Sequence, residues 1–330
     1  RDLHSFPTRR SSDLVVEVDA KTEKFNLTGI ANNKVSAAEV FHTDVSAHGM
    51  AAASYLRDAN LSAAGSQTFI GKSGSFGGSV LLGVAAAELT HRAENITNTA
   101  LTGRWNLLRD IKASAVNREK FDLLSDTSSA AIVNGSGAGI DSRDTQQATV
   151  RVANAAIRTE GAQTFEAANH LDDDKTEIST AGFGGLGVNS SRLAQDRTYT
   201  AEVSLTNADL SAKGKIGALA LTTGRLTAEN GLAGLGAVST TTAFSDIKTA
   251  YENRVMVKGG KIATDLAEDG GSGSAITLAA HENMSISLSA VADNQYGLGG
   301  AAVTHLNTTL RRKNTTTRSE ERRVGKECRS

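Results

Sequence analysis

Cysteine and proline are nearly missing from this chain of 330 residues, which contains one of each, Cys328 and Pro7. A lone cysteine excludes an intrachain disulfide framework and a zinc site built from several thiolates. Scarce proline suits backbones that stay hydrogen-bonded to neighbouring strands, because proline removes a donor from such a ladder. Aromatic residues make up 4% of the chain, with a single tryptophan. This composition disfavours a thick globular core and favours a thin one made of valine, isoleucine, leucine and alanine.

The two ends of the chain differ from the rest of it and from each other. Residues 1–14 resemble the translation of a short-read sequencing adaptor, and residues 318–330 resemble the same adaptor read from its complementary strand. Codons can be chosen for residues 4–13 whose reverse complement encodes residues 319–327. We therefore interpret both ends as non-native and residues 15–317 as an internal piece of a repeat region. The alternative is a pair of genuine basic tails.

Removing the two ends changes the charge balance of the chain. Lysine plus arginine falls from 35 to 27, with three lost at the start and five at the end, and aspartate plus glutamate falls from 36 to 31. Residues 15–317 then carry a formal charge of −4, compared with −1 for the whole chain. Without a basic patch, we expect no nucleic-acid partner and no attraction to an anionic membrane.

Two short signatures recur along the chain at a spacing near fifty residues. The first reads Ala-Asp-Leu-Ser-Ala-Lys-Gly at 208–214, and we align it with residues 60–65, 110–115 and 156–161. The second reads Gly-Leu-Gly-Ala-Val at 234–238, and we align it with residues 83–86, 139–142, 187–190 and 300–303. Two interleaved series with a common spacing indicate a repeat array, in which each unit packs only against its neighbours.

Alternating apolar and polar residues predict β-strands throughout, for example at 198–205 and 284–289. Clusters of Asn, Asp, Gly and Ser between these runs predict turns. A sandwich, a barrel and a solenoid all fit frequent strands, but drifting spacing, small core residues and proline-free corners favour a β-solenoid. If each unit is two coils, about a dozen coils would form a rod roughly 60 Å long. Residues 101–126 also fit an amphipathic helix, although we prefer strands there.

A glycine-rich strand paired with a downstream Asp-Leu-Ser-Ala-x-Gly strand resembles the shaft of filamentous haemagglutinin-like exoproteins and leukotoxin-type filamentous adhesins. The resemblance covers residues 15–314 and lies in the overall repeat pattern, not in a diagnostic motif. It implies a right-handed parallel β-helix that is secreted or displayed on the surface of a Gram-negative bacterium. It further implies export through an outer-membrane translocator and attachment of the parent protein to a host surface or extracellular matrix.

Several motifs were weighed as sites, and none is assigned as catalytic, cofactor-binding or metal-binding. Residues 182–187 match G-x-G-x-x-G, but no helix is expected after them, so we interpret them as a repeat turn. The aspartates at 172–174 and the run Glu-Asp-Gly-Gly at 268–271 offer oxygen ligands for calcium, yet neither recurs in tandem, so solvated corners are preferred. The histidines stand singly.

The sequence therefore predicts a non-catalytic structural shaft without a cofactor or a small-molecule substrate. One alternative is a solenoid face that binds glycan or protein, for which Phe165, Phe183 and Tyr199 are the aromatic candidates. A second alternative is a β-helix enzyme that degrades polysaccharides, with carboxylates converging in a groove. Because the terminal coils lack caps, we also expect the chain to associate end to end.

Overall fold

The computed structural model describes residues 6–49, 56–264, 276–295 and 298–319, and all the regular elements in these ranges are β-strands. There are seven: β1 (Phe6–Gly49), β2 (Ala59–Leu107), β3 (Ile111–Thr159), β4 (Gln163–Ala212), β5 (Ile216–Thr264), β6 (Ile276–Gln295) and β7 (Gly299–Ser319).

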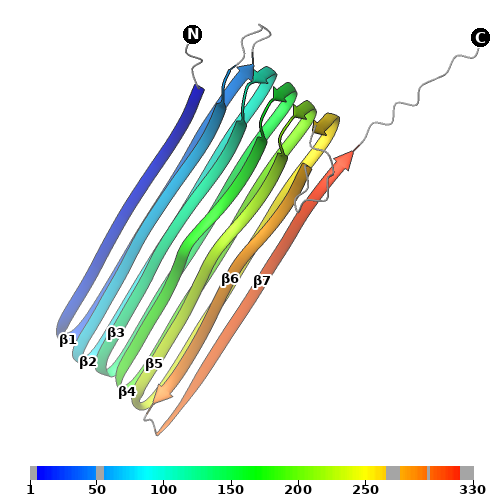
Figure 1. Cartoon of the computed structure of the whole chain (residues 1–330). Helices are drawn as coiled ribbons and strands as arrows, with labels where there is room; N and C mark the ends of the chain where they lie inside the picture. The colour runs from blue at the N-terminus through cyan, green and yellow to red at the C-terminus, as the bar shows by residue number, and fades with distance from the viewer. Residues whose placement is uncertain (1–5, 50–55, 265–275, 296–297, 320–330) are drawn as a thin grey trace, which may run out of the picture.

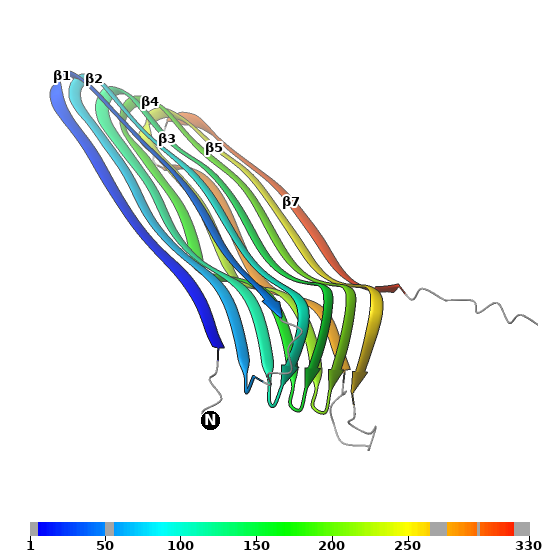
Figure 2. The same ribbon diagram turned by 90° about the horizontal axis from the view of Figure 1, so that it is seen from above.

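Each of β1 to β5 runs along one layer, bends sharply and returns along a second layer (Figures 1 and 2). One such element therefore makes one coil, with two long arms joined at the bend. The sixth coil is shared, since β6 pairs with the first arm of β5 and β7 with the second. All neighbouring pairs are parallel. The predicted all-β parallel β-solenoid is confirmed.

The coil repeat is steadier than the sequence signatures suggested. Ala59 pairs with Ile111, Ile111 with Gln163, and Gln163 with Ile216, so each coil advances the chain by just over fifty residues. The expectation of two coils per unit is wrong, because the two arms of a single coil use up the whole repeat. Six coils at ~4.8 Å each span about 29 Å, half of the roughly 60 Å expected from a dozen.

The alignment of the first signature is only partly right. Residues 156–159 do pair with residues 209–212, near the end of the second arm. The supposed equivalents at 60–65 lie instead at the start of the first arm, where Leu61 pairs with Ala113 and not with Ile111. In the second signature Gly83 and Gly187 occupy one column, whereas Gly139 is displaced. Alternation looks the same in both arms, so it does not reveal which arm a segment belongs to.

The interior is thin, as predicted, because small side chains meet across it. One column runs through five neighbouring strands and consists only of alanine: Ala63, Ala115, Ala167, Ala220 and Ala280. Larger apolar residues form three buried clusters: one toward the tight turns, one around the middle of the arms, and a small one made of Leu171, Tyr199 and Tyr251.

A belt of amides and hydroxyls separates the apolar cluster at the tight turns from the other two. Asn117 Nδ2 donates to Asn169 Oδ1 at 3.0 Å, and Asn253 Nδ2 donates to Asn314 Oδ1 at 2.9 Å. The hydroxyl of Thr222 donates to Asn253 Oδ1 at 2.7 Å across the interior. These bonds give buried amides and hydroxyls partners within the interior, both between neighbouring coils and across it.

The helical alternative for residues 101–126 is excluded, since β2 and β3 cover this segment except for a tight turn at 108–110. Strand β1 begins at Phe6, so residues 6–14 of the adaptor-like start pair with β2, at residues 59–67. The interpretation of 1–14 and 318–330 as non-native, and of 15–317 as the repeat region, stays a prediction. The described residues contain no helix long and apolar enough to span a bilayer.

Candidate functional site

The three consecutive aspartates interrupt the alternation of β4 at a β-bulge. Between Leu171 and Lys175, β4 advances by four residues, whereas the facing stretches of β3 and β5 advance by three. The extra residue is accommodated at Asp173, whose φ of 54° lies in the left-handed region. Asp172 and Asp173 consequently both lie exposed on the outer face, while Asp174 is buried in the interior.

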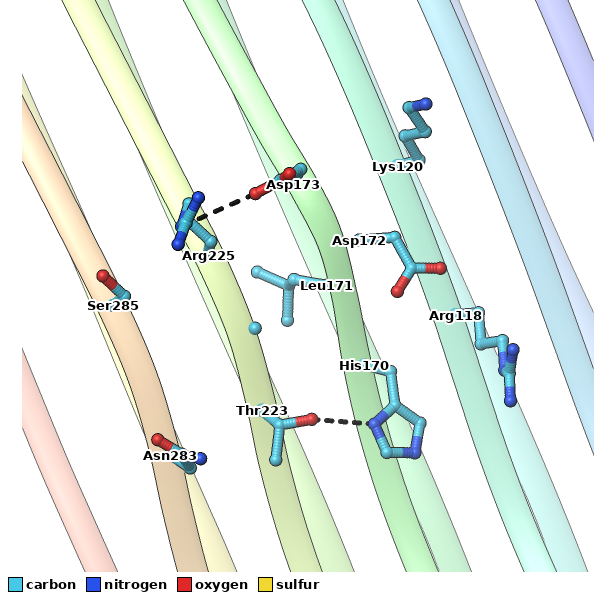
Figure 3. Close-up of a pocket in the computed structure, with 11 residues that line it drawn as sticks. Arg118, Lys120, His170, Leu171, Asp172, Asp173, Thr223, Arg225, Asn283 and Ser285 are labelled. Carbon is cyan, nitrogen blue, oxygen red and sulfur yellow. Dashed lines mark hydrogen bonds and ion pairs between the residues drawn. The ribbon is translucent and has the colours of Figure 1, made fainter.

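On the outer face the bulge borders a shallow polar depression of about 870 Å³ that extends from β3 to β6 (Figure 3). Arg225 Nε lies 3.6 Å from Asp173 Oδ1, an exposed ion pair between neighbouring coils. His170 Nδ1 lies 2.8 Å from the hydroxyl of Thr223. Asp172 points away from these contacts, toward the β3 side of the depression (Figure 3).

The depression carries both signs of charge. Arg118 and Lys120 project from β3, on the far side of Asp172 from Arg225 (Figure 3). Burial lowers the pKa of the His170 imidazole, and the nearby Arg118 guanidinium lowers it further. A neutral histidine beside two exposed cations suits a ligand with an anionic group, held by charge-assisted hydrogen bonds.

Beneath the bulge lies a buried ion pair between the two layers. Arg197 and Asp174 are both fully buried, with Arg197 Nη1 2.7 Å from Asp174 Oδ2. The other carboxylate oxygen of Asp174 accepts the backbone N–H of Phe121 at 2.9 Å. This N–H lies where the bulge shifts the register between β3 and β4 and interrupts the backbone hydrogen bonds. The side chain of Asp174 therefore accepts a hydrogen bond from a backbone donor at the interruption.

Two further carboxyl groups lie around the same guanidinium. Glu119 lies 3.8 Å from Arg197 Nη1, and both side chains are fully buried. Burial raises the pKa of Asp144 to about 6 and that of Asp174 to about 7, although Arg197 opposes both shifts. Burial, with Asp144 and Asp174 nearby, raises the pKa of Glu119 well above its usual range. One guanidinium does not hold three buried carboxyls ionised together, so part of the cluster stays protonated at neutral pH.

His91 completes this part of the interior as an uncharged packing residue. Its ring stacks on Phe69 with the ring centres 4.2 Å apart and meets the edge of Phe121 at 4.5 Å. Burial, together with the charge of Arg197, lowers the pKa of His91 to about 3. The guanidinium of Arg197 also lies 5.4 Å from the centre of the Phe121 ring, within reach of a cation–π interaction.

The buried cluster cannot act on a dissolved molecule. Arg197, Asp174 and Glu119 have no exposed side-chain surface, so a substrate does not reach them in the folded chain. Their chemistry is confined to holding β3 and β4 against each other. The outer depression is the accessible polar site at the bulge, and we take it as the candidate site.

The other motifs resolve as structural parts. Residues 182–187 pair with the part of β5 where the partner changes from β6 to β7, so they lie at the bend of β4, and they are followed by more strand and not by a helix, as the turn interpretation predicted. A side chain at Gly184 would overlap the carbonyl of Ala131 in the neighbouring bend. The run at 268–271 lies outside the described residues. Among the residues that are described, no three His, Cys, Asp or Glu side chains are placed to hold a metal ion.

The aromatic candidates for a binding face do not share one. Phe165 and Tyr199 are completely buried, and Tyr199 stacks on Tyr251 with ring centres 5.6 Å apart. Phe183 is 43% exposed but lies at the bend. An aromatic glycan-binding face built from these three residues is therefore ruled out.

Sequence reasoning missed the buried cluster, although a signal was present. In its alternating run, Arg197 occupies one of the positions that face inward, on the same side as the buried Leu193 and Ala201. Glu119 similarly stands two residues from the buried Phe121. A charged residue on the apolar side of an alternating run marks a buried partner, but the partner itself lies on another arm.

No family model matches the chain, and no curated protein and no solved structure matches it either.

Proposed function

We propose that this chain is a stretch of structural shaft from a large secreted or surface-exposed bacterial adhesin or exoprotein of the filamentous haemagglutinin-like or leukotoxin type. In this proposal it has no catalytic role. The observation that supports it best is the parallel stacking of whole coils at an almost constant repeat of just over fifty residues. A stack stabilised by neighbouring coils grows longer without needing a larger core.

The contacts between elements support a purely linear organisation. Strands pair only with the next coil along the axis, in the order β1-β2-β3-β4-β5-β6, with β7 beside β5. Such a rod separates its two ends by a distance set by the number of coils. That property suits a spacer which holds a binding region away from the cell.

The partners and location in this proposal rest on the sequence resemblance. The parent protein would be exported through an outer-membrane translocator and would reach a host surface or extracellular matrix. We also propose that the terminal coils of this chain stack end to end, because strand edges without a neighbour pair readily with other edges. Such stacking is open-ended, so it gives a series of growing species in sedimentation, and a single species at high concentration would contradict it.

The shaft proposal is tested by reading further into the source DNA. After the adaptor is trimmed from the raw reads, we expect the open reading frame to continue in both directions through more units of the same length. It should lead toward a signal peptide or a translocator. A frame that closes within one or two coils, with capping segments and an accessible carboxylate groove, would replace the shaft by an enzyme.

The polar depression at the bulge supports a second candidate, a binding module on the solenoid face. The probe is an immobilised polyanion, with heparin and a neutral dextran compared side by side. We expect Arg118→Ala with Lys120→Ala to abolish retention on heparin if the depression binds anions. Arg192→Ala, at an exposed position on the other arm, is the matched control. Equal retention of all three proteins would remove this candidate.

A further inference from the structure

The bends of successive coils place apolar side chains in a single exposed column. Leu82 pairs with Val133, Val133 with Leu186, and Leu186 with Val238. Their exposed fractions are 38%, 41%, 52% and 46%. Ile132 and Phe183, 57% and 43% exposed, lie beside this column. We call these six residues the bend ridge; it runs parallel to the solenoid axis along one edge.

A turn in this protein does not have to be apolar, as the opposite edge of the same coils shows. There the tight turns carry exposed charged residues such as Arg109, Asp110 and Glu160. Lys213 forms an ion pair with Glu160 of the preceding coil. Both edges reverse the chain, yet only the bends repeat an exposed aliphatic side chain from coil to coil, whereas at the tight turns Leu108 stands among exposed charged residues. Folding alone therefore does not account for the bend ridge.

The bend ridge also lacks charge over its whole length. Residues 79–83, 131–135, 183–187 and 235–239 contain no charged side chain. Within these four strands, the charged residues next in the sequence before and after the ridge are six acids and two bases: Lys72, Glu88, Asp126, Asp141, Glu177, Arg192, Glu229 and Asp246. An uncharged apolar strip with polar margins is typical of a surface that is covered by a partner.

We propose that the bend ridge is the contact surface for a second copy of this chain, in an isologous dimer that joins two solenoids edge to edge. A second copy presents the same apolar column at the same coil spacing, so the two ridges match along their whole length. A bilayer fits less well, because the margins are mostly acidic and the ridge has neither the Trp or Tyr nor the Lys or Arg that anchor proteins at membrane interfaces.

The size of the ridge sets the strength of the association. Three coil steps of ~4.8 Å separate Leu82 from Val238, so the column is about 14 Å long. A standard stable interface covers roughly 800 Å² on each partner, more than so narrow a strip offers. The dimer of this chain is therefore weak and forms only at high concentration. Each additional coil would lengthen the ridge and strengthen the dimer.

The test is sedimentation velocity over a wide concentration range with three proteins. End-to-end stacking is expected in all three proteins alike, so ridge pairing is the additional association that the control variant keeps and the ridge variant loses. Val133→Lys with Leu186→Lys places charges on neighbouring coils of the ridge and is expected to raise the dissociation constant at least tenfold. Thr145→Lys with Thr198→Lys is the matched control, because these residues also pair between β3 and β4 and are exposed.

A disulfide gives an independent measurement that does not depend on charge. With Cys328 replaced by Ser, Leu186→Cys is expected to form a disulfide-linked dimer under mild oxidation, whereas Thr145→Cys is not. Circular dichroism spectra that match the unaltered chain show that each variant is folded. A monomeric chain at all concentrations, or equal dimerisation of the ridge and control variants, would overturn the proposal. Ridge-dependent flotation with phosphatidylcholine vesicles by a chain that stays monomeric would assign the ridge to lipid instead.

Discussion

Arg197 is the residue on which the interior of β3 and β4 depends most. It is the one guanidinium beside three buried carboxyl groups, and it touches Asp174 directly at 2.7 Å. Burial by itself would lower the pKa of Arg197. Tyr199 and the carboxylates around the guanidinium raise this pKa by more than burial lowers it, so the side chain keeps its charge. Buried charges of this kind stabilise a fold only as a set, since each partner compensates the desolvation of the other.

Replacing Arg197 by Met is expected to destabilise the chain strongly. The free energy of unfolding should fall by about 3–5 kcal/mol, because breaking a buried pair leaves carboxylates without a counter-charge. The measurement is urea denaturation followed by circular dichroism. Arg192→Met is the control, since Arg192 is exposed on the same arm. Adding Asp174→Asn to Arg197→Met should restore part of the loss, and equal midpoints for both single variants would contradict the role assigned to Arg197.

The buried carboxyls also predict how stability depends on pH. A carboxyl whose pKa is raised by folding holds its proton more tightly in the folded state, so its stabilising effect is present near pH 4 and is lost as the pH rises through the folded value. Those values are about 6 for Asp144 and about 7 for Asp174. His91 acts in the opposite direction, because its pKa is lowered to about 3 and stability is lost as the pH falls below 6.5.

Asp144→Asn is therefore expected to flatten the loss of stability between pH 4 and 7. A shift of about two units corresponds to at most ~3 kcal/mol, at about 1.36 kcal/mol per unit. Thermal unfolding midpoints across this pH range measure the effect. Asp141→Asn, three residues away on the outer face, should leave the profile unchanged. Identical profiles for the two variants would show that Asp144 does not titrate with folding.

At the scale of an element, β4 is longer than its neighbours by the one residue of its bulge. Leu171 is buried, Asp172 and Asp173 are exposed, and Asp174 is buried again. Removing one of the two exposed residues would restore a regular alternation and match β4 to β3 and β5 without moving any other side chain to the opposite face.

Deleting Asp173 is therefore expected to leave a folded chain with a change in unfolding free energy below ~1 kcal/mol, since it also removes a residue held at positive φ. Deleting Ser179, which is exposed in the same arm but outside the bulge, should prevent folding. A one-residue slip there turns the rest of the arm inside out. Circular dichroism and limited proteolysis distinguish the two outcomes, and equal tolerance of both deletions would refute the bulge.

At the scale of the whole molecule, the register makes complete coils interchangeable units. Ile111 pairs with Gln163, so removing residues 111–162 joins the turn at Asp110 to an equivalent position in the next coil. We expect this shorter chain to fold and to lose about 4.8 Å of length along the axis, the spacing of one coil. Small-angle scattering and urea denaturation measure the length and the stability.

The control deletion removes the following coil, residues 163–215, and with it Arg197. This chain should be clearly less stable than the first, because Glu119 and Asp144 remain buried without the guanidinium. Similar stabilities for the two deletions would mean that the buried cluster contributes little to the stack. Failure of both to fold would contradict the independence of the coils.

The candidate site was only partly accessible to sequence reasoning. The run at 172–174 offers oxygen ligands and is predicted to be a solvated corner, and the predicted exposure to solvent is right for Asp172 and Asp173. The position at a corner is wrong for all three residues, which lie within an arm of β4, and the exposure is wrong for Asp174, because the bulge that turns this residue inward is defined by the lengths of β3 and β5 beside it. A bulge is a mismatch between partners, so one strand alone does not reveal it.

The sequence by itself determined the all-β class, the solenoid, the repeat near fifty residues and the thin alanine-rich core. These follow from composition and from a period of two, which act over a few neighbouring residues. Only the tertiary structure decided that one repeat is one coil, which arm each segment occupies, that Asp174 meets Arg197, and that the bends line up as an apolar ridge. A period of two assigns a side chain to a face but not to a partner, and here the partners are set by pairing between strands a whole coil apart in the sequence.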